Sequence, residues 1–194
     1  FSGYAQNDAQ EFLRFFLDAL HDDLNRILEK PSYEEIDDSG LDQKALGEVY
    51  WRNYEERNSS HIKDIFCGQL KSVVTCGQCS AKSSSFDPFW DLSLSLPAGR
   101  KRCTIEECMK SFSEPETLDG TEKYFCKSCK KHTRASKTMS IERWPPIVVL
   151  HIKRLLPQKR LSTSVDIDET EVLDLGKMAG GLTTRYSLMG QVNH

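Results

Sequence analysis

Four cysteines of this chain have the spacing of a metal-binding site. They form two Cys-x-x-Cys pairs, at 76–79 and 126–129, with 46 residues between them (80–125). Two intervening residues let two thiolates from one tight turn face the same ion, and two such turns complete a tetrahedral set of sulfur ligands at about 2.3 Å. Because four sulfurs leave no open coordination position, the expected ion is a structural Zn²⁺ held by Cys76, Cys79, Cys126 and Cys129.

Two other interpretations of the paired cysteines stay open at this point. They could be reduced thiols without metal, or a redox-active dithiol. A redox pair would need no twin, however, and neither pair opens a helix in a βαβ pattern. Small or polar residues suit the two turns: Gly77 and Ser128. Three lysines near the second pair would offset excess negative charge: Lys127, Lys130 and Lys131.

The other three cysteines, Cys67, Cys103 and Cys108, are expected to be small packing residues, although a lone cysteine can be a nucleophile. The total of seven is odd, so complete intramolecular disulfide pairing is impossible. No secretory signal pattern opens the sequence. A reducing compartment is therefore expected, which means the cytoplasm, the nucleus or both.

Size and composition exclude several classes of protein. A length of 194 residues predicts one domain, or one domain with a sub-module. Lys and Arg number 26 against 29 Asp and Glu, which gives a net charge of −3 and removes the electrostatic case for a dedicated nucleic-acid binder. No apolar run approaches the ~18 residues of a membrane span, so no membrane partner is expected.

Helical patterns come first along the chain. Residues 7–30 predict one long amphipathic helix, capped by Asn7 or Asp8 and stopped by Pro31. Its apolar residues recur at steps of three and four: Phe12, Leu13, Phe16, Leu20, Leu24, Ile27 and Leu28. After an acidic, turn-rich loop at 31–42, helical spacing returns at 43–59.

Strand patterns dominate from there on. Strands are expected at 69–75, 83–87, 92–96, 123–125, 134–141, 147–152, 163–174 and 184–192. A short helix at 104–112 interrupts them, with Thr104 and Glu107 as a capping box. The β-branched run at 147–152 suits a central strand. Helices followed by strands, with a metal clip on extended hairpins, indicate an α+β fold.

Three segments, in order along nearly the whole chain, resemble one family. Residues 3–13 are similar to the QQDAQEF box of ubiquitin-specific proteases. Residues 86–96 resemble the strand that leaves the family's first zinc knuckle. Residues 144–154 resemble its P-x-x-L-x-x-x-L-K-R-F strand, with Leu155 where Phe is usual. The two cysteine pairs fall where the family's zinc ribbon falls.

The resemblance implies a papain-like ubiquitin-specific protease fold of thumb, fingers and palm, here incomplete. Residues 1–60 correspond to thumb helices, 61–138 to zinc-ribbon fingers with a helical insertion, and 139–194 to palm strands. In the family the fingers grip the body of ubiquitin, and the cleft between thumb and palm takes its C-terminal tail. The implied partners are ubiquitin and ubiquitinated proteins.

The resemblance also implies a set of substrate-binding residues. Asp8 and Glu11 are acids at a helix N-terminus, where capping and the helix dipole alone would favour them. In the family these acids, together with Gln10, line the cleft and can pair with arginines of the ubiquitin tail. Trp90 and Asp91 are expected to flank the same cleft.

The family's catalytic dyad is not expected within these residues. Its nucleophilic cysteine lies in a box upstream of residues 3–13, and its general base follows the strand that ends at Asn193–His194. The sequence starts with Phe and stops after a strand-like stretch, so we interpret it as an internal segment. His151 lies in an apolar run and is expected to be a packed strand residue.

The parent would be a thiol protease that cleaves after the last glycine of ubiquitin through a thioester, and the segment itself would be inactive. Two alternatives from other classes remain. One is a non-catalytic ubiquitin-binding module or pseudoenzyme with a zinc ribbon. The other is a zinc-ribbon interaction domain unrelated to ubiquitin.

Overall fold

The computed structural model describes residues 8–32, 36, 41–156, 159–167, 172–178 and 184–192. Its helices are α1 (Ala9–Asp23), α2 (Gln43–Glu55), α3 (His61–Phe66), α4 (Ile105–Ser113) and α5 (Leu175–Met178), with one short 3-10 helix, η1 (Gly120–Glu122). Its first strands are β1 (Gly68–Cys76), β2 (Lys82–Phe89), β3 (Leu92–Ser95), β4 (Arg102–Thr104), β5 (Glu116–Leu118), β6 (Tyr124–Cys126) and β7 (Lys131–Thr133). The later strands are β8 (Ala135–Arg143), β9 (Leu150–Lys153), β10 (Leu155–Leu156), β11 (Lys159–Arg160), β12 (Ser164–Asp166), β13 (Val172–Asp174) and β14 (Arg185–Ser187).

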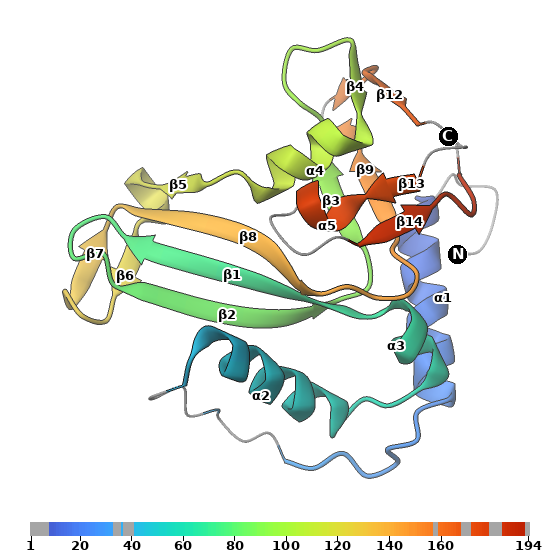
Figure 1. Cartoon of the computed structure of the whole chain (residues 1–194), viewed down its shortest axis with the longest axis horizontal. Helices are drawn as coiled ribbons and strands as arrows, with labels where there is room; N and C mark the ends of the chain where they lie inside the picture. Colours follow the sequence, from blue (N-terminus) through green and yellow to red (C-terminus); the bar gives the residue numbers. More distant parts are fainter. Residues whose placement is uncertain are drawn as a thin grey trace.

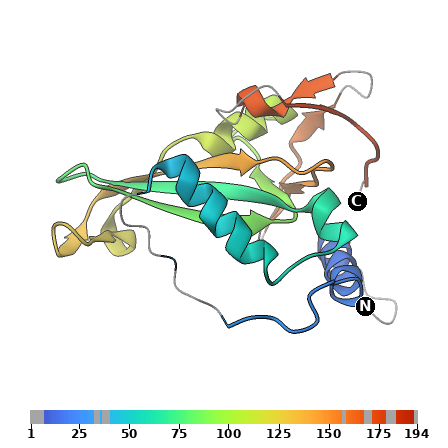
Figure 2. The same cartoon turned by 60° about the horizontal axis from the view of Figure 1, so that its bottom comes forward.

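A four-stranded sheet, in the order β2-β1-β8-β5, forms the long axis of the molecule (Figure 1). Strand β1 is central and pairs antiparallel with β2 along its length and with β8 as far as Cys76 opposite Ala135. Helix α2 lies along this sheet, and the ring of Tyr50 is 5.6 Å from that of Phe86 (Figure 2). The β1–β2 turn and the β6–β7 hairpin lie at one end of the sheet, and α1 lies at the other (Figures 1 and 2). The α+β class is confirmed.

Several short strand pairs complete the structure. β3 pairs with β9 and β4 with β12 in parallel, whereas β6–β7, β10–β11 and β13–β14 are antiparallel. The largest buried cluster packs α4 and α5 against β3 and the end of the long sheet: Phe89, Leu92, Leu94, Cys103, Ile105, Cys108, Met109, Ile141 and Leu175. A smaller cluster joins α1 to α2 and to the start of β1 and β3: Leu17, Trp51, Cys67 and Trp90. None of the described helices is long and apolar enough to cross a membrane.

Helix α1 is shorter than the apolar pattern predicted, because it ends at Asp23 and not at residue 30. The side-chain oxygen of Asn25 accepts hydrogen bonds from the backbone N–H groups of Ile27 (3.1 Å) and Ser59 (3.0 Å). The backbone N–H of Arg26 also donates to the Ser59 carbonyl at 2.7 Å. Asparagine competes in this way with helical hydrogen bonding, so these bonds to a distant segment end the helix before Pro31.

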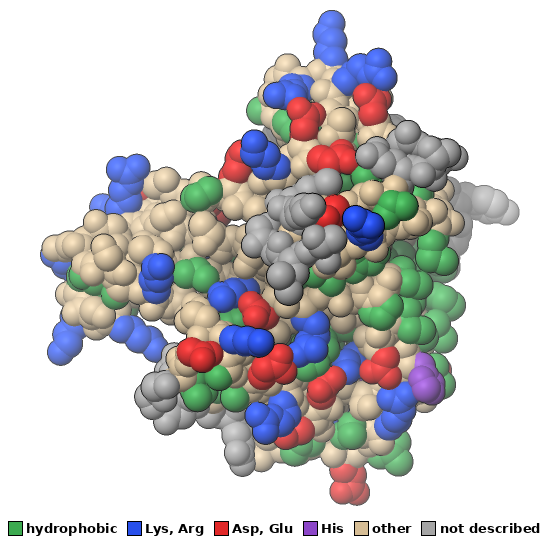
Figure 3. Space-filling model, in the orientation of Figure 1, with side chains coloured by type: hydrophobic (Ala, Val, Ile, Leu, Met, Phe, Trp, Pro, Cys, Tyr) green, Lys and Arg blue, Asp and Glu red, His purple; other side chains and the backbone are tan. Residues whose placement is uncertain are grey.

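The apolar face of α1 is also buried less than its periodicity suggested. Leu17 is buried, but Phe12, Phe15 and Phe16 are 50%, 61% and 48% exposed. Hydrophobic side chains gather along the α1 side of the surface (Figure 3). Periodicity identified a helix but could not say which apolar side chains the rest of the chain covers.

Other predicted helices and strands differ from the structure in where they begin or end and in which strands they pair with. The helix predicted for residues 43–59 ends at Glu55, and a separate helix, α3, begins after Ser60, whose side chain accepts the Lys63 N–H. The strand predicted to be central at 147–152 starts only at Leu150, is half-buried, and pairs among the described residues with β3 alone. The predicted strand at 163–174 becomes β12 and β13, with residues 168–171 outside the described part. Most of the predicted loop at 31–42 also lies outside it.

Gly68 lies in tightly packed surroundings at the start of β1. A Cβ at this position would lie 2.5 Å from ring atoms of Phe89 and 2.6 Å from the carbonyl oxygen of Arg143. We expect Gly68→Ala to lower the free energy of unfolding by about 1–3 kcal/mol, because backbone or a buried ring must move. Chemical denaturation measures this. Gly190→Ala is the matched control, since nothing lies within 4 Å of its added Cβ; equal stability of the two variants would contradict the packing.

Candidate functional site

The two cysteine pairs meet at the end of the long sheet. The four Sγ atoms of Cys76, Cys79, Cys126 and Cys129 all lie within 4.8 Å of one another. Cys76 and Cys129 are 3.9 Å apart, and Cys79 and Cys126 are 3.6 Å apart. Sulfurs bound at about 2.3 Å to one tetrahedral ion would be separated by about 3.8 Å, whereas a disulfide needs about 2.05 Å. The donor set therefore fits a single Zn²⁺ and no disulfide.

The two turns that carry the cysteines have the same backbone geometry. In each, the residue after the second cysteine has a positive φ, 58° at Ser80 and 54° at Lys130. Its N–H donates to the carbonyl of the first cysteine, at 3.0 Å in the first turn and 2.8 Å in the second. Backbone N–H groups also point at sulfur, from Gln78 to Cys76 and from Cys129 to Cys126, both at 3.4 Å. Such donors stabilise thiolates, so both turns suit metal ligands.

Gly77 has a further role beyond the turn that the sequence suggested. Its N–H donates to the carbonyl of Arg134 at 2.8 Å, and an added Cβ would lie 2.8 Å from that same oxygen. A glycine here lets the first turn approach the chain between β7 and β8. A backbone hydrogen bond thus holds the first cysteine turn beside the chain that follows β7, in addition to the close approach of the four sulfur atoms.

Neighbouring groups perturb the thiols unequally. The Thr133 hydroxyl lies 3.2 Å from Sγ of Cys76 and is the main cause that lowers the pKa of that thiol to about 6. Hydrogen bonds with the other thiols, first that of Cys79, raise the pKa of Cys129 to about 12. Four thiolates so close together repel one another, and a bound Zn²⁺ would remove that repulsion while cross-linking the β1–β2 turn to the β6–β7 hairpin.

The metal centre generates a test of stability. We expect Cys126→Ser, or a chelator, to remove zinc and unfold the knuckle end of the sheet while α1 keeps part of its helical signal, because metal binding is coupled to folding. Zinc content and residue-resolved hydrogen exchange measure the two effects. Cys67→Ala, a thiol outside the cluster, should keep its zinc. Unchanged thermal stability after complete zinc removal would contradict a structural metal.

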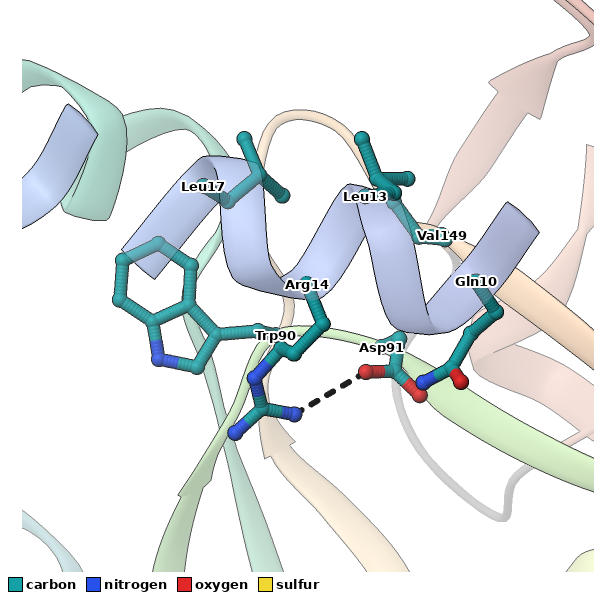
Figure 4. Close-up of a pocket in the computed structure, with 7 residues that line it drawn as sticks. All are labelled: Gln10, Leu13, Arg14, Leu17, Trp90, Asp91 and Val149. Atoms are coloured by element: carbon teal, nitrogen blue, oxygen red, sulfur yellow. Dashed lines mark hydrogen bonds and ion pairs between the residues drawn. The ribbon is translucent and has the colours of Figure 1, made fainter. Parts of the chain in front are cut away.

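A second group of predicted residues meets where α1 crosses the β2–β3 junction. Asp8 caps α1, and its side chain accepts the Gln10 N–H at 2.8 Å. One face of α1 lines a small pocket through Gln10, Leu13, Arg14 and Leu17, whose positions repeat at helical steps. Trp90, Asp91 and Val149 form the facing side (Figure 4). The structure therefore brings Gln10, Trp90 and Asp91 together at one pocket, with Asp8 at the adjoining end of α1.

Asp91 already has a partner inside the chain. Its carboxylate lies 3.1 Å from a guanidinium nitrogen of Arg14, and only 9% of its side chain is exposed (Figure 4). Arg14 also lies 3.6 Å from Asp18, one helical turn away. Sequence analysis missed Arg14, and the only local signal for it is this i, i+4 spacing of opposite charges.

The remaining predicted residues have different surroundings. Trp90 is 6% exposed and packs in the cluster of Leu17, Trp51 and Cys67, so it is a core residue that also lines the pocket. Glu11 lies on the exposed side of the first turn of α1.

His151 was expected to be a packed strand residue, and it is half-buried in β9. Its ring, however, has polar neighbours. Nδ1 lies 3.1 Å from the hydroxyl of Ser93, and Nε2 lies 4.0 Å from the carboxylate of Asp8. The Ser93 hydroxyl also reaches Asp91 at 3.5 Å. Ser93 and His151 thus connect the two acids, a link that sequence reasoning did not find.

The three cysteines outside the cluster are confirmed as buried packing residues. Cys67, Cys103 and Cys108 are 4%, 3% and 0% exposed. Burial raises the pKa of Cys67 to about 11 and that of Cys108 to about 12. In the described part of the chain, none of the three hydrogen-bonds to a histidine ring, so none has the surroundings of an activated thiolate.

This fold and the four-cysteine cluster are those of the ubiquitin-specific proteases. The family model described as "Ubiquitin carboxyl-terminal hydrolase" matches residues 1–194, and the chain belongs to this family. Among individual relatives, it is 42% identical over 203 residues to ubiquitin carboxyl-terminal hydrolase 2 of Gallus gallus and 43% identical over 201 residues to that of Homo sapiens. These alignments cover 100% of this chain, 56% of the chicken protein and 33% of the human one. The chain therefore spans about half or less of these curated relatives.

Solved structures give the same assignment. The SAGA DUB module Ubp8/Sgf11/Sus1/Sgf73 bound to monoubiquitin contains a chain 26% identical to this one, with a TM-score of 0.63. The match covers 92% of this chain and 35% of that chain. The module bound to ubiquitin aldehyde matches with a TM-score of 0.60 at 25% identity. The expected fold class is thus confirmed, and membership of this family argues against a zinc-ribbon interaction domain unrelated to ubiquitin.

Proposed function

We propose that this chain is the ubiquitin-recognising, zinc-stabilised part of a deubiquitinating thiol protease that hydrolyses the bond after the last glycine of ubiquitin. The observation that carries the proposal is that Gln10 and Asp91 line one pocket, while Asp8 caps the helix that forms its wall, in a fold shared with modules bound to ubiquitin. Ubiquitin and ubiquitinated proteins are the proposed partners. The proposed division is thumb 1–60, fingers 61–138 and palm 139–194, in the cytoplasm, the nucleus or both.

The residues of the pocket and those at the start of α1 would have different roles in binding the ubiquitin tail. The Asp8 side chain is 35% exposed and Glu11 lies on the surface, so both carboxylates are accessible to tail arginines. Charge-assisted carboxylate–guanidinium bonds suit this contact. Asp91 is nearly covered and paired, and its role is to position Arg14 beside Gln10. Trp90 supplies the rigid wall.

The nucleophile and the general base are proposed to lie outside these residues. In support, four of the seven thiols form the metal cluster, and the other three are buried. The same burial favours a second candidate function, a ubiquitin-binding module or pseudoenzyme that has no catalytic dyad at all. Sequencing the transcript upstream distinguishes the two: an Asn-x-x-x-Asn-Thr-Cys-like segment supports the enzyme, and a start codon just before Phe1 supports the module.

Tail recognition is tested by removing charge without removing the helix cap. Asp8→Asn retains a good N-cap, since Asn and Asp cap about equally well. Combined with Glu11→Gln, it is expected to weaken ubiquitin binding about tenfold, which is about 1.4 kcal/mol, through lost charge-assisted bonds. Calorimetric titration measures this. Asp22→Asn with Asp23→Asn removes two charges from the exposed far end of α1 and is the matched control.

Ubiquitin whose tail arginines are replaced by alanine completes a double-mutant cycle. We expect it to bind the wild-type chain and the double variant equally, since the pairing partners are then gone. Full additivity of the two changes would contradict contact between these acids and the tail.

The proposal that this chain has no catalytic activity by itself is tested with a fluorogenic ubiquitin substrate. The purified chain is expected to release no fluorophore from a ubiquitin–coumarin substrate above the buffer rate, because its described thiols are buried or in the cluster. A complete ubiquitin carboxyl-terminal hydrolase 2 serves as the positive control. The proposal would be overturned if turnover co-purified with the chain and if substituting a single one of its cysteines abolished that turnover.

A further inference from the structure

Next to the four-cysteine cluster there is a basic hollow whose residues are not those proposed to bind the ubiquitin tail. It lies between the first cysteine turn and the β6–β7 hairpin and has a volume of about 330 Å³. Its walls carry Gly77 and Gln78 of the first turn, together with Asp119, Lys123, Lys131, His132, Thr133 and Arg134. The one acid among them, Asp119, is paired with Arg134 at 3.7 Å. We call this hollow the fingertip groove.

The positive charge around the fingertip groove exceeds what a zinc site requires. Residues 123–137 contain six Lys or Arg and no Asp or Glu, whereas the whole chain has a net charge of −3, so the remaining residues sum to −9 (−3 − 6). Zn²⁺ with four thiolates carries −2. The lysines that offset this charge therefore leave an excess of about +4 in the segment, in a chain that is otherwise acidic.

Most of these cations have no acidic partner. Of the six, Arg134 alone forms an ion pair with a described residue, Asp119, at 3.7 Å. Elsewhere basic side chains are commonly paired, as in Arg143 with Glu48 at 2.9 Å. Four exposed lysines of the segment have no described acidic partner: Lys123, Lys127, Lys130 and Lys131. Basic side chains gather around the β6–β7 end of the molecule (Figure 3).

The fingertip groove is held in shape by its own contacts. The Gly77 N–H donates to the Arg134 carbonyl at 2.8 Å, and Nδ1 of His132 lies 3.1 Å from the Lys123 carbonyl. The ring of His132 packs edge-on against Phe125 at 5.4 Å, and Phe125 is itself 50% exposed. A groove shaped before binding orders few side chains when a ligand arrives. An exposed aromatic ring beside cations offers apolar contact as well as charge.

We propose that the fingertip groove binds an acidic, Asp/Glu-rich segment of a partner protein. A short acidic peptide is affected mainly by charges within a Debye length of about 8 Å, where the cations dominate. A long nucleic acid would extend over the remaining surface, which is net negative and would repel its phosphates. The fingertip groove is opposite in charge to the proposed tail site, whose acids suit arginines, so the two sites select different ligands. The inference does not depend on the proposed tail contacts, because it uses other residues.

The experiment uses the zinc-loaded chain and a fluorescein-labelled peptide of about ten alternating Asp and Glu residues. Fluorescence anisotropy at low salt measures its binding. We expect Lys123→Glu with Lys131→Glu to weaken binding at least about tenfold, because local charge falls by about four units within a Debye length. Lys44→Glu with Lys110→Glu is the control: both lysines are exposed outside the segment, and the net charge of the chain is the same. This control should bind about as tightly as the wild type.

Four results would overturn the proposal: no binding, equal weakening by the control pair, equal binding of a Gln-only peptide, or tighter binding of oligothymidylate with the same charge. Zinc content and thermal unfolding confirm that each variant folds. If the glutamate variant does not fold, Lys123→Gln with Lys131→Gln should still weaken peptide binding severalfold. Binding of the peptide by this glutamine variant as tightly as by the wild type would equally overturn the inference. Ubiquitin titrated in parallel separates the two proposals, because loss of either interaction leaves the other to be measured.

Discussion

The convergence of four cysteine sulfurs on one point is the constraint on which the sheet end of this molecule depends. The sulfurs come from two hairpins separated by 46 residues of chain, and they lie within 4.8 Å of one another. Thiolates at such distances repel, so a divalent ion converts an unfavourable cluster into a cross-link. The long excursion between the hairpins includes β3, β4 and α4, and an ion bound by the four sulfurs would close its far end. Strand β1 connects this end to the rest of the sheet, because it lies between β2 and β8 and pairs with both.

The other end of the molecule is positioned by buried polar contacts. Nδ1 of His21 lies 2.7 Å from the hydroxyl of Ser60. The same hydroxyl accepts a hydrogen bond from the backbone N–H of Lys63 in the first turn of α3. Asn25 makes hydrogen bonds to the same segment. Since buried polar groups are costly unless paired, these contacts specify one arrangement of α1 against α3. Through Leu17 and Trp90 they also fix where α1 crosses the β2–β3 junction, and hence the pocket.

Charge is segregated between the two ends, although the composition is nearly balanced. Asp8 and Glu11 lie at the start of α1, and Asp91, which faces that helix, is paired with Arg14. Cations gather around the metal turns, beyond what the thiolates require. A net charge of −3 conceals this separation. Because screening limits electrostatic effects to about a Debye length, each end interacts with ligands according to its local charge.

Local patterns in the amino-acid chain were enough to predict the two Cys-x-x-Cys turns, a cap at Asn7 or Asp8, the alternation of β3 and the Thr104 capping box, since each depends only on neighbours within a few residues. That the two cysteine turns meet, although 46 residues separate them, is a long-range property of the fold. Long-range contacts decided the rest: where α1 ends, that Arg14 pairs with Asp91, and that β9 has one described partner. Periodicity and propensity contribute only tenths of a kcal/mol per residue. Buried hydrogen bonds and ion pairs between distant segments contribute more, and only folding brings their partners together.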